Sequence, residues 1–239
     1  MIHKFSEKNG CKFIICSDTG ENHVSTGADN QDSALYGVIS EDCQFIAVAD
    51  GVSSVKYGRE GSQAAVQSVK WLAEQIDLGF VDIRDENNIR ISYVLNWKSN
   101  FEGNWDDYAS TINFVIIKGS DLLVGQIGDG LILVDTEKEK HIYGESEDFY
   151  SCETYALGRA VIKSSFILEL LSGISNSVAV MMSDGIGKEI EPDQRVEMLG
   201  YISELARSDN SAKEIEEWIS ELSERNGDDK TIGIMVGRD

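Results

Sequence analysis

Three short apolar runs that border acidic turns constrain the fold of this chain most strongly. The runs and their acids are residues 45–49 with Asp50, residues 178–182 with Asp184, and residues 231–236 with Asp228. Runs of this length that are rich in Ile, Val and Ala are typical of buried strands. We therefore expect buried strands that deliver carboxylates to one edge of the fold.

Carboxylates that lie close together favour a bound cation. Outside water they repel one another, and each is pushed toward its neutral form unless a cation stands between them. A further acidic motif, Asn30-Gln31-Asp32, adds to the set. Oxygen ligands without a His or Cys cluster favour magnesium or manganese over zinc. A single Asp-Gly pair is ordinary turn chemistry at a strand end, but the motifs together predict one metal site.

Further short apolar segments predict a strand-rich chain. Strands are expected at 11–17, 33–39, 44–49, 110–117, 121–127, 130–135, 164–170, 177–183 and 231–236. Strands and helices come in blocks rather than in regular βαβ alternation. This order predicts an α+β layered fold with mostly antiparallel sheets.

Helical periodicity appears in two stretches, residues 58–76 and residues 89–101. The apolar positions of the second stretch include Ile89, Tyr93, Leu95 and Trp97.

Two more helices are predicted in the last fifth of the chain. One enters at Glu191-Pro192 and runs to about residue 207, and the other runs from Ser211 to about residue 225. Pro is favoured in a first helical turn, and Ser211 with Glu214 fits a capping box in which the serine is the N-cap.

Composition predicts one domain over residues 1–239. The 239 residues with 41% hydrophobic content can bury a sizeable core, and the only Pro leaves no Pro-rich linker. No apolar run approaches the roughly 20 residues that span a bilayer, and the first residues lack the order of a signal peptide. These features predict a cytoplasmic protein. The spacing of the four cysteines, Cys11, Cys16, Cys43 and Cys152, predicts reduced thiols.

The formal charge is −21, from 42 acidic and 21 basic residues. Such a charge argues against nucleic acid and anionic membranes as partners. Solubility alone accounts for it, although an acidic surface would also attract protein partners with basic segments.

The acidic motifs resemble those of a known family, the metal-dependent PPM or type-2C serine/threonine protein phosphatases of bacterial type. The resemblance covers nearly the whole chain, in the family's order. It rests on residues 30–33, 48–54, 57–62, 109–111, 124–130, 154–158, 183–186 and 228–231.

The resemblance implies a four-layer αββα sandwich, with two central sheets flanked by helix pairs. It also implies hydrolysis of phosphoserine and phosphothreonine in proteins by a water that bridges two Mn²⁺ or Mg²⁺ ions. In the family's pattern Asp50 would bridge both ions, Gly51 would bind one through its carbonyl, and Asp184 and Asp228 would ligate them. Asp32 would act directly or through a bound water. Asp129 would contribute to a third, weaker metal site.

Departures from the family's pattern concern substrate phosphate and the third metal. The family's phosphate-binding arginine is replaced by Gly27, and Lys188 stands where many members place an Asp. Lys56, Arg59 and Arg159 are open as replacements for the arginine. Val52 replaces a histidine that is proposed as general acid in many eukaryotic members. His23 would help bind phosphate or transfer a proton, or is simply structural.

A short flap is expected at about residues 135–163, which would leave the cleft open.

Three functions compete. The favoured one is an active phosphatase that opposes a cellular serine/threonine kinase. The second is a catalytically weak or inactive module of the same fold that binds a phosphoprotein or regulator, for which the missing arginine is the main support. The third is a metallohydrolase of small phosphate esters or nucleotides, although no nucleotide fingerprint is present.

Overall fold

The strands of the chain form two stacked antiparallel sheets. A computed structural model describes residues 2–8, 10–136, 138–144, 155–158, 165–208, 211–223 and 227–238. The six-stranded sheet has the order β1 (Ile2–Lys8), β2 (Cys11–Asp18), β11 (Lys230–Val236), β10 (Val178–Met182), β7 (Leu131–Asp135) and β8 (Lys140–Tyr143). The five-stranded sheet has the order β3 (Asp32–Val38), β4 (Cys43–Asp50), β5 (Ile112–Lys118), β6 (Asp121–Ile127) and β9 (Ile167–Ser172).

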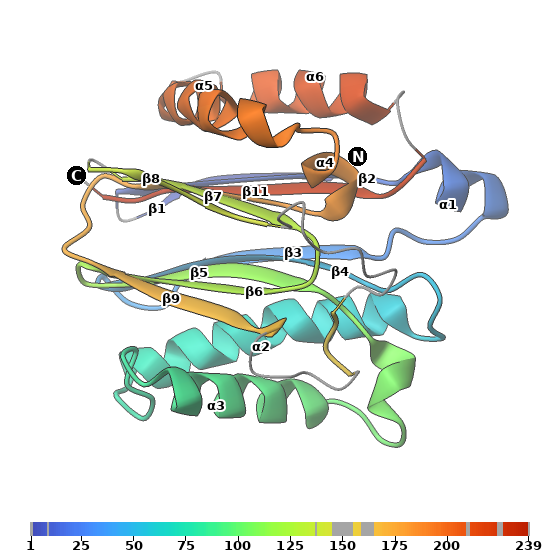
Figure 1. Cartoon of the computed structure of the whole chain (residues 1–239), viewed down its shortest axis with the longest axis horizontal. Coiled ribbons are helices and arrows are strands. Elements are labelled where there is room, and N and C mark those ends of the chain that lie inside the picture. The colour runs from blue at the N-terminus through green and yellow to red at the C-terminus, as the bar shows by residue number, and fades with distance from the viewer. Residues whose placement is uncertain are drawn as a thin grey trace.

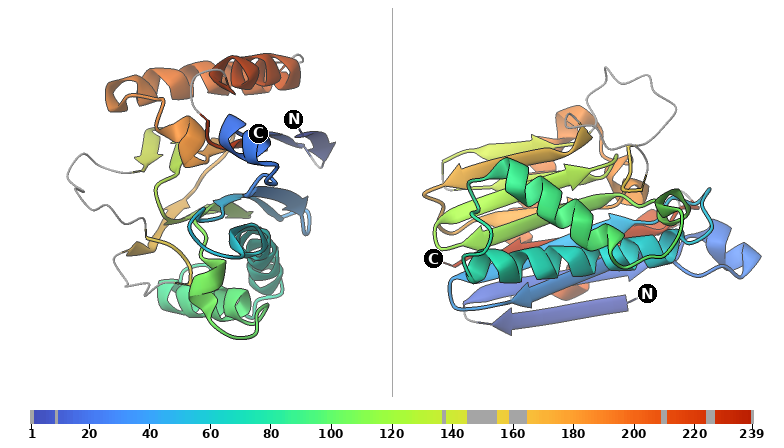
Figure 2. Two further views of the ribbon diagram at one scale, coloured as in Figure 1. Left: turned by 90° about the vertical axis from the view of Figure 1, so that its right-hand side faces the viewer. Right: turned by 90° about the horizontal axis from the view of Figure 1, so that it is seen from below.

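A pair of helices covers the outer face of each sheet (Figure 1). Helices α2 (Gly58–Asp77) and α3 (Glu86–Lys98) lie across the five-stranded sheet, as the view from below in Figure 2 shows. Helices α5 (Arg195–Arg207) and α6 (Ser211–Ser223) cover the six-stranded sheet. The short elements are α1 (Glu21–Thr26), α4 (Asp184–Gly187) and the 3₁₀ turns at Trp105–Tyr108 and Pro192–Gln194. The predicted four-layer αββα sandwich is thus confirmed.

Three apolar clusters fill the three spaces between the layers. In β4 the residues Phe45, Ala47 and Ala49 belong to the cluster beneath α2 and α3, whereas Ile46 and Val48 belong to the cluster between the sheets. Successive side chains of a strand point to opposite faces, so a strand buried on both faces must be apolar throughout. This is why the predicted strands appeared as continuous apolar runs.

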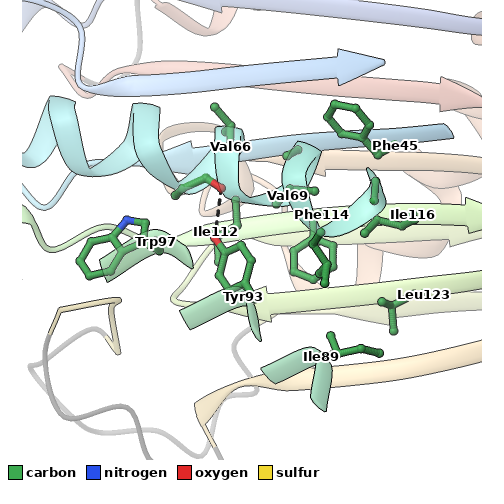
Figure 3. Packing of buried hydrophobic residues seen from close by; sticks show 14 of the residues in the cluster. Phe45, Val66, Val69, Ile89, Tyr93, Trp97, Ile112, Phe114, Ile116 and Leu123 are labelled. Atoms are coloured by element: carbon green, nitrogen blue, oxygen red, sulfur yellow. Dashed lines mark hydrogen bonds between the residues drawn. The ribbon is translucent and has the colours of Figure 1, made fainter. Parts of the chain in front are cut away.

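Buried aromatic side chains fix α3 against α2 and the sheet (Figure 3). The Tyr93 hydroxyl donates to the carbonyl of Ala65 at 3.2 Å, and the Trp97 indole Nε1 donates to the carbonyl of Gly61 at 3.1 Å. Buried Tyr and Trp need such acceptors for their polar atoms. Because Gly61 lies in the first turns of α2, Trp97 also fixes the helix that follows the Asp50 turn.

Most predicted elements are present, but the structure differs from the prediction at several points, and the short helix α1 was not predicted. The Leu95 side chain is 61% exposed, because only Ile89, Tyr93 and Trp97 follow the four-residue spacing of the buried stripe. The polar strand β1 was not predicted, although the Asn9-Gly10 pair that precedes β2 is a hairpin signal. Helix α6 begins at Ser211, so the predicted N-cap is its first residue.

The predicted flap at 135–163 lies largely outside the described residues, apart from residues 135–136, residues 138–144 with strand β8, and residues 155–158. Across the described residues, no helix is long and apolar enough to cross a membrane.

Loss of the Trp97 side chain is expected to destabilise the fold far more than loss of an exposed tryptophan. Trp97→Ala removes a fully buried ring and should lower the free energy of unfolding by about 3–5 kcal/mol. Trp105→Ala, at a side chain that is 41% exposed, should cost less than about 1 kcal/mol. Urea denaturation followed by circular dichroism measures both, and equal losses would contradict the packing described for α3.

Candidate metal centre

The β3–β4 pairing brings two of the predicted acids together. Asp32 at the start of β3 lies directly opposite Asp50 at the end of β4. The Gly51 amide donates to the carbonyl of Gln31 at 3.2 Å, which extends the pairing beyond the strands. The antiparallel register of β3 and β4 therefore places these two acidic residues next to each other.

The β10–β11 pairing brings the other two acids to the same end. The amide of Ser183 donates to the carbonyl of Thr231 at 2.9 Å, and the amide of Thr231 donates to Ser183 Oγ at 2.9 Å. Asp184 follows Ser183 as the first residue of α4, and Asp228 lies just before β11. These bonds join the end of β10 to the start of β11. Both acids therefore lie where these two central strands of the six-stranded sheet end.

A pocket of about 150 Å³ lies where these edges meet. It is lined by His23, Gln31, Asp50, Gly51, Val52, Ser53, Thr111, Asp129, Asp184, Lys188 and Asp228. Asp32 lines a neighbouring cavity of about 320 Å³ instead, together with Asn30 and Arg59. The structure therefore places three of the four predicted catalytic acids, with Gly51 and Asp129, around one pocket, whereas Asp32 lines the other cavity.

The glycines of the Asp-Gly motifs permit close backbone packing around this pocket. A β-carbon on Gly51 would collide with the backbone of Gly58, and one on Gly185 would collide with the carbonyl of Asp229. Neither glycine has a positive φ. Their role is therefore close approach between segments rather than an unusual turn conformation.

The Asp32 carboxyl is buried without compensation. Within the described chain, both of its oxygens are shielded from solvent and make no hydrogen bond of normal geometry. Burial raises the pKa of Asp32 to about 7, and the Thr231 and Ser183 hydroxyls only partly oppose this. A carboxyl with no partner of its own is the expected neighbour of a bound cation.

Two further acids show the same strain. Burial, followed by the nearby charges of Asp32 and Asp184, raises the pKa of Asp50 well above its ordinary value. Burial and the charge of Asp184 also raise the pKa of Asp228. Mutual repulsion of carboxylates thus adds to burial at this pocket.

The oxygen atoms that line the pocket are of the kind that binds a hard divalent ion, but they do not converge on one position in this structure. Within the part of the chain that the structure describes, no three acidic, histidine or cysteine side chains form a group that could hold an ion. The pocket offers carboxylate oxygens together with the backbone of Gly51, which are ligands that Mg²⁺ and Mn²⁺ prefer.

Asp229 organises the pocket, and its role was not predicted. Its buried carboxylate accepts from the Gly20 amide at 2.8 Å and the Gln31 amide at 2.7 Å, and it pairs with His23 Nδ1 at 2.8 Å. It thereby joins the start of α1 and the segment before β3 to β11. The duplicated acid in Asp228-Asp229 was the available sequence signal, since only one of the two was needed as a ligand.

Comparison with known proteins identifies the family. A family model described as protein phosphatase 2C matches residues 19–220. The chain belongs to the protein phosphatase 2C family. No curated protein sequence matches significantly.

Three solved structures share the protein phosphatase 2C fold at low sequence identity. RsbX in complex with magnesium is 15% identical with a TM-score of 0.66, covering 99% of this chain and 100% of RsbX. The Mycobacterium tuberculosis serine/threonine phosphatase PstP/Ppp is 17% identical with a TM-score of 0.67, covering 96% and 99%. The PstP catalytic domain in complex with two manganese ions is also 17% identical, with a TM-score of 0.65 and the same coverage.

Two of the residues expected to replace the missing arginine, Lys56 and Arg59, do not line the pocket of this phosphatase-2C chain. Gly27 ends α1 with a positive φ of 70°, and a β-carbon added there would meet no atom within 4 Å. Arg59 pairs with Asp29 and lines the neighbouring cavity, and the Lys56 ammonium lies over the Tyr57 ring. Arg159 lies outside the described residues.

Two other basic side chains line the pocket itself, His23 and Lys188. The Lys188 ammonium donates to Asp184 Oδ2 at 2.6 Å and to Asp129 Oδ2 at 2.9 Å.

In the metal-free protein, Asp32 should make stability depend on pH. Its pKa is about 7 in the fold and about 3.9 in an unfolded chain, so between these values the folded state binds more protons and stability falls as pH rises. Asp32→Asn removes this dependence. In EDTA, its advantage in unfolding free energy over the unmodified protein should grow from pH 5 to pH 8, by roughly 1.4 kcal/mol per pH unit below the folded pKa.

Urea denaturation at the two pH values measures this advantage. The control is Asp193→Asn at an exposed acid, whose effect should be equal at both. An Asp32→Asn effect that is also equal at both pH values would contradict the raised pKa.

Proposed function

We propose that this chain is a metal-dependent phosphoserine/phosphothreonine protein phosphatase. The observation that carries the proposal is the buried, unpartnered Asp32 carboxyl opposite Asp50, beside a pocket that Asp184 and Asp228 also line. Keeping such acids together is costly unless a cation compensates them. Membership of the protein phosphatase 2C family supports the same chemistry.

In this proposal the residues at the strand ends would hold two ions. Asp50 would contact both, Asp184 and Asp228 would each hold one, and Gly51 would offer its carbonyl. Asp32, which lies opposite Asp50, would act directly or through a bound water. When bound, two Mn²⁺ or Mg²⁺ ions would activate water for attack on phosphorus and neutralise charge on the phosphoryl oxygens. That Asp129 ligates a third, weaker ion stays a prediction.

His23 is the best-placed residue for the substrate phosphate. Its ring lines the pocket, while Nδ1 is held at 2.8 Å by the buried Asp229 carboxylate. That bond fixes the ring and leaves Nε2 as the other polar atom. A hydrogen bond from Nε2 to a phosphoryl oxygen would supply part of the anchoring that Gly27 lacks.

The expected substrates are phosphorylated proteins, and the expected partner enzyme is a serine/threonine kinase that produces them. Related folds described as serine/threonine phosphatases support this class of substrate. The net charge of −21 favours phosphorylated segments with basic residues nearby.

A phosphoprotein-binding module without turnover is the second candidate, because Gly27 offers no side chain to the phosphate. Binding of a phosphopeptide without phosphate release in the assay below would favour it.

Phosphate release from a phosphothreonine peptide tests the proposal directly. The purified protein should require Mn²⁺ or Mg²⁺, and Asp50→Asn should lower kcat/KM at least about 100-fold, beyond the 10- to 100-fold typical for loss of an outer partner of a metal ligand. Asp193→Asn, at an exposed acid of the Pro192–Gln194 turn, should leave turnover unchanged. Metal-independent release, or full activity of Asp50→Asn, would overturn the proposal.

Removal of the His23 ring should weaken phosphate binding. His23→Ala is expected to raise KM and the inhibition constant of inorganic phosphate by about 10-fold or more, since a hydrogen bond to a charged group contributes about 1.5–3 kcal/mol. His141→Ala, in β8 and outside the pocket, is the matched control. Unchanged inhibition by phosphate in His23→Ala would show that the histidine serves only the local structure.

A further inference from the structure

One ammonium group lies between two carboxylates at the pocket wall. Lys188 Nζ is 2.6 Å from Asp184 Oδ2 and 2.9 Å from Asp129 Oδ2. The Asp184 and Asp129 side chains are 14% and 9% exposed, whereas Lys188 is 55% exposed and reaches inward from the end of α4. The two acids are thus largely removed from water and share one cation that belongs to the chain.

The local fold holds this ammonium in place. Lys188 stands four residues after Asp184, and its amide donates to the Asp184 carbonyl at 3.0 Å, which closes one helical turn. Residues four apart on a helix lie on one face. Asp129 is brought to the same place from the turn between β6 and β7. The Lys188 side chain therefore links the turn between β6 and β7 to the start of α4.

A third divalent ion between Asp129 and Asp184 would compete with this ammonium. Lys188 Nζ already contacts one oxygen of each carboxylate. An ion placed there would have to displace the ammonium from both carboxylates.

We propose that the Lys188 ammonium acts as a built-in cation that replaces a third metal ion between Asp129 and Asp184, so that the chain binds two divalent ions at most. Only one part of this inference, that the number of bound divalent ions is two, rests on the proposed function. A further consequence concerns Asp184: the ammonium holds Oδ2, so Oδ1 is the oxygen left for an ion in the pocket. Asp129 then serves to position Lys188 rather than to ligate metal.

Binding of Mn²⁺ alone tests the proposal without reference to activity. Equilibrium dialysis followed by metal analysis should give two Mn²⁺ per chain for the unmodified protein. Lys188→Asp removes the ammonium and adds a carboxylate, so it should bind one more ion than the unmodified protein. Lys213→Asp is the matched control, because Lys213 also pairs with an acid four residues away, Glu217, on the exposed face of α6. It should leave the stoichiometry unchanged.

Thermal unfolding in EDTA provides a second readout. Lys188→Met leaves two largely buried carboxylates without their cation, so its Tm should fall by about 2–4 °C. Lys213→Met should change Tm by less than about 1 °C, as expected for an exposed pair. If Lys188→Asp does not fold, Lys188→Met also serves for the dialysis, since it frees both carboxylates.

The outcomes separate this inference from the proposed function. Three Mn²⁺ ions on the unmodified protein, or no additional ion on the Lys188 variants, would overturn the built-in cation. A gain of one ion by Lys188→Asp over an unmodified protein that binds none would support it while contradicting the two-ion phosphatase. Two ions without phosphate release would leave it supported and contradict only the proposed activity.

Discussion

The geometry of the pocket depends on the hydrogen bonds that the buried Asp229 carboxylate accepts. This carboxylate receives the amides of Gly20 and Gln31 and the ring of His23. These donors belong to the start of α1 and to the segment before β3, and the carboxylate itself belongs to the start of β11. A buried carboxylate with three donors is stabilised where it lies, so it fixes the three segments together. The neighbouring acid, Asp228, is left to line the pocket.

The pocket then concentrates charge that the fold alone does not neutralise. Within the described residues, the two Asp32 carboxyl oxygens make no hydrogen bond of normal geometry, and the pKa values of Asp32, Asp50 and Asp228 are all raised. Lys188 offsets only part of this, because its one ammonium is shared between Asp129 and Asp184. The rest of the sandwich, with its three apolar clusters, supplies the rigidity that keeps such acids in place.

Much of the architecture followed from local patterns. Strands buried on both faces require continuous apolar runs, and these were visible at β4, β5, β6, β10 and β11. The edge strand β1 was missed because an edge strand needs no such run. Leu95 was assigned to the apolar side of α3 by residue type, although its position on the helix turns it toward solvent. Composition and turn chemistry could not supply that correction.

The resemblance of the acidic motifs to a known family implied two sheets flanked by helix pairs. The sequence by itself determined that strand ends would carry acids, which acids they were, and that the fold would be α+β with mostly antiparallel sheets. Each of these depends on short-range periodicity and on residue type. Only the tertiary structure decided that Asp32 faces a neighbouring cavity, that Asp229 unites three segments, and that Lys188 reaches Asp129 as well as Asp184. The contacts of Asp129 and Asp229 join residues 59 or more positions apart, and their distances are set by sheet register and layer packing, which no local pattern encodes.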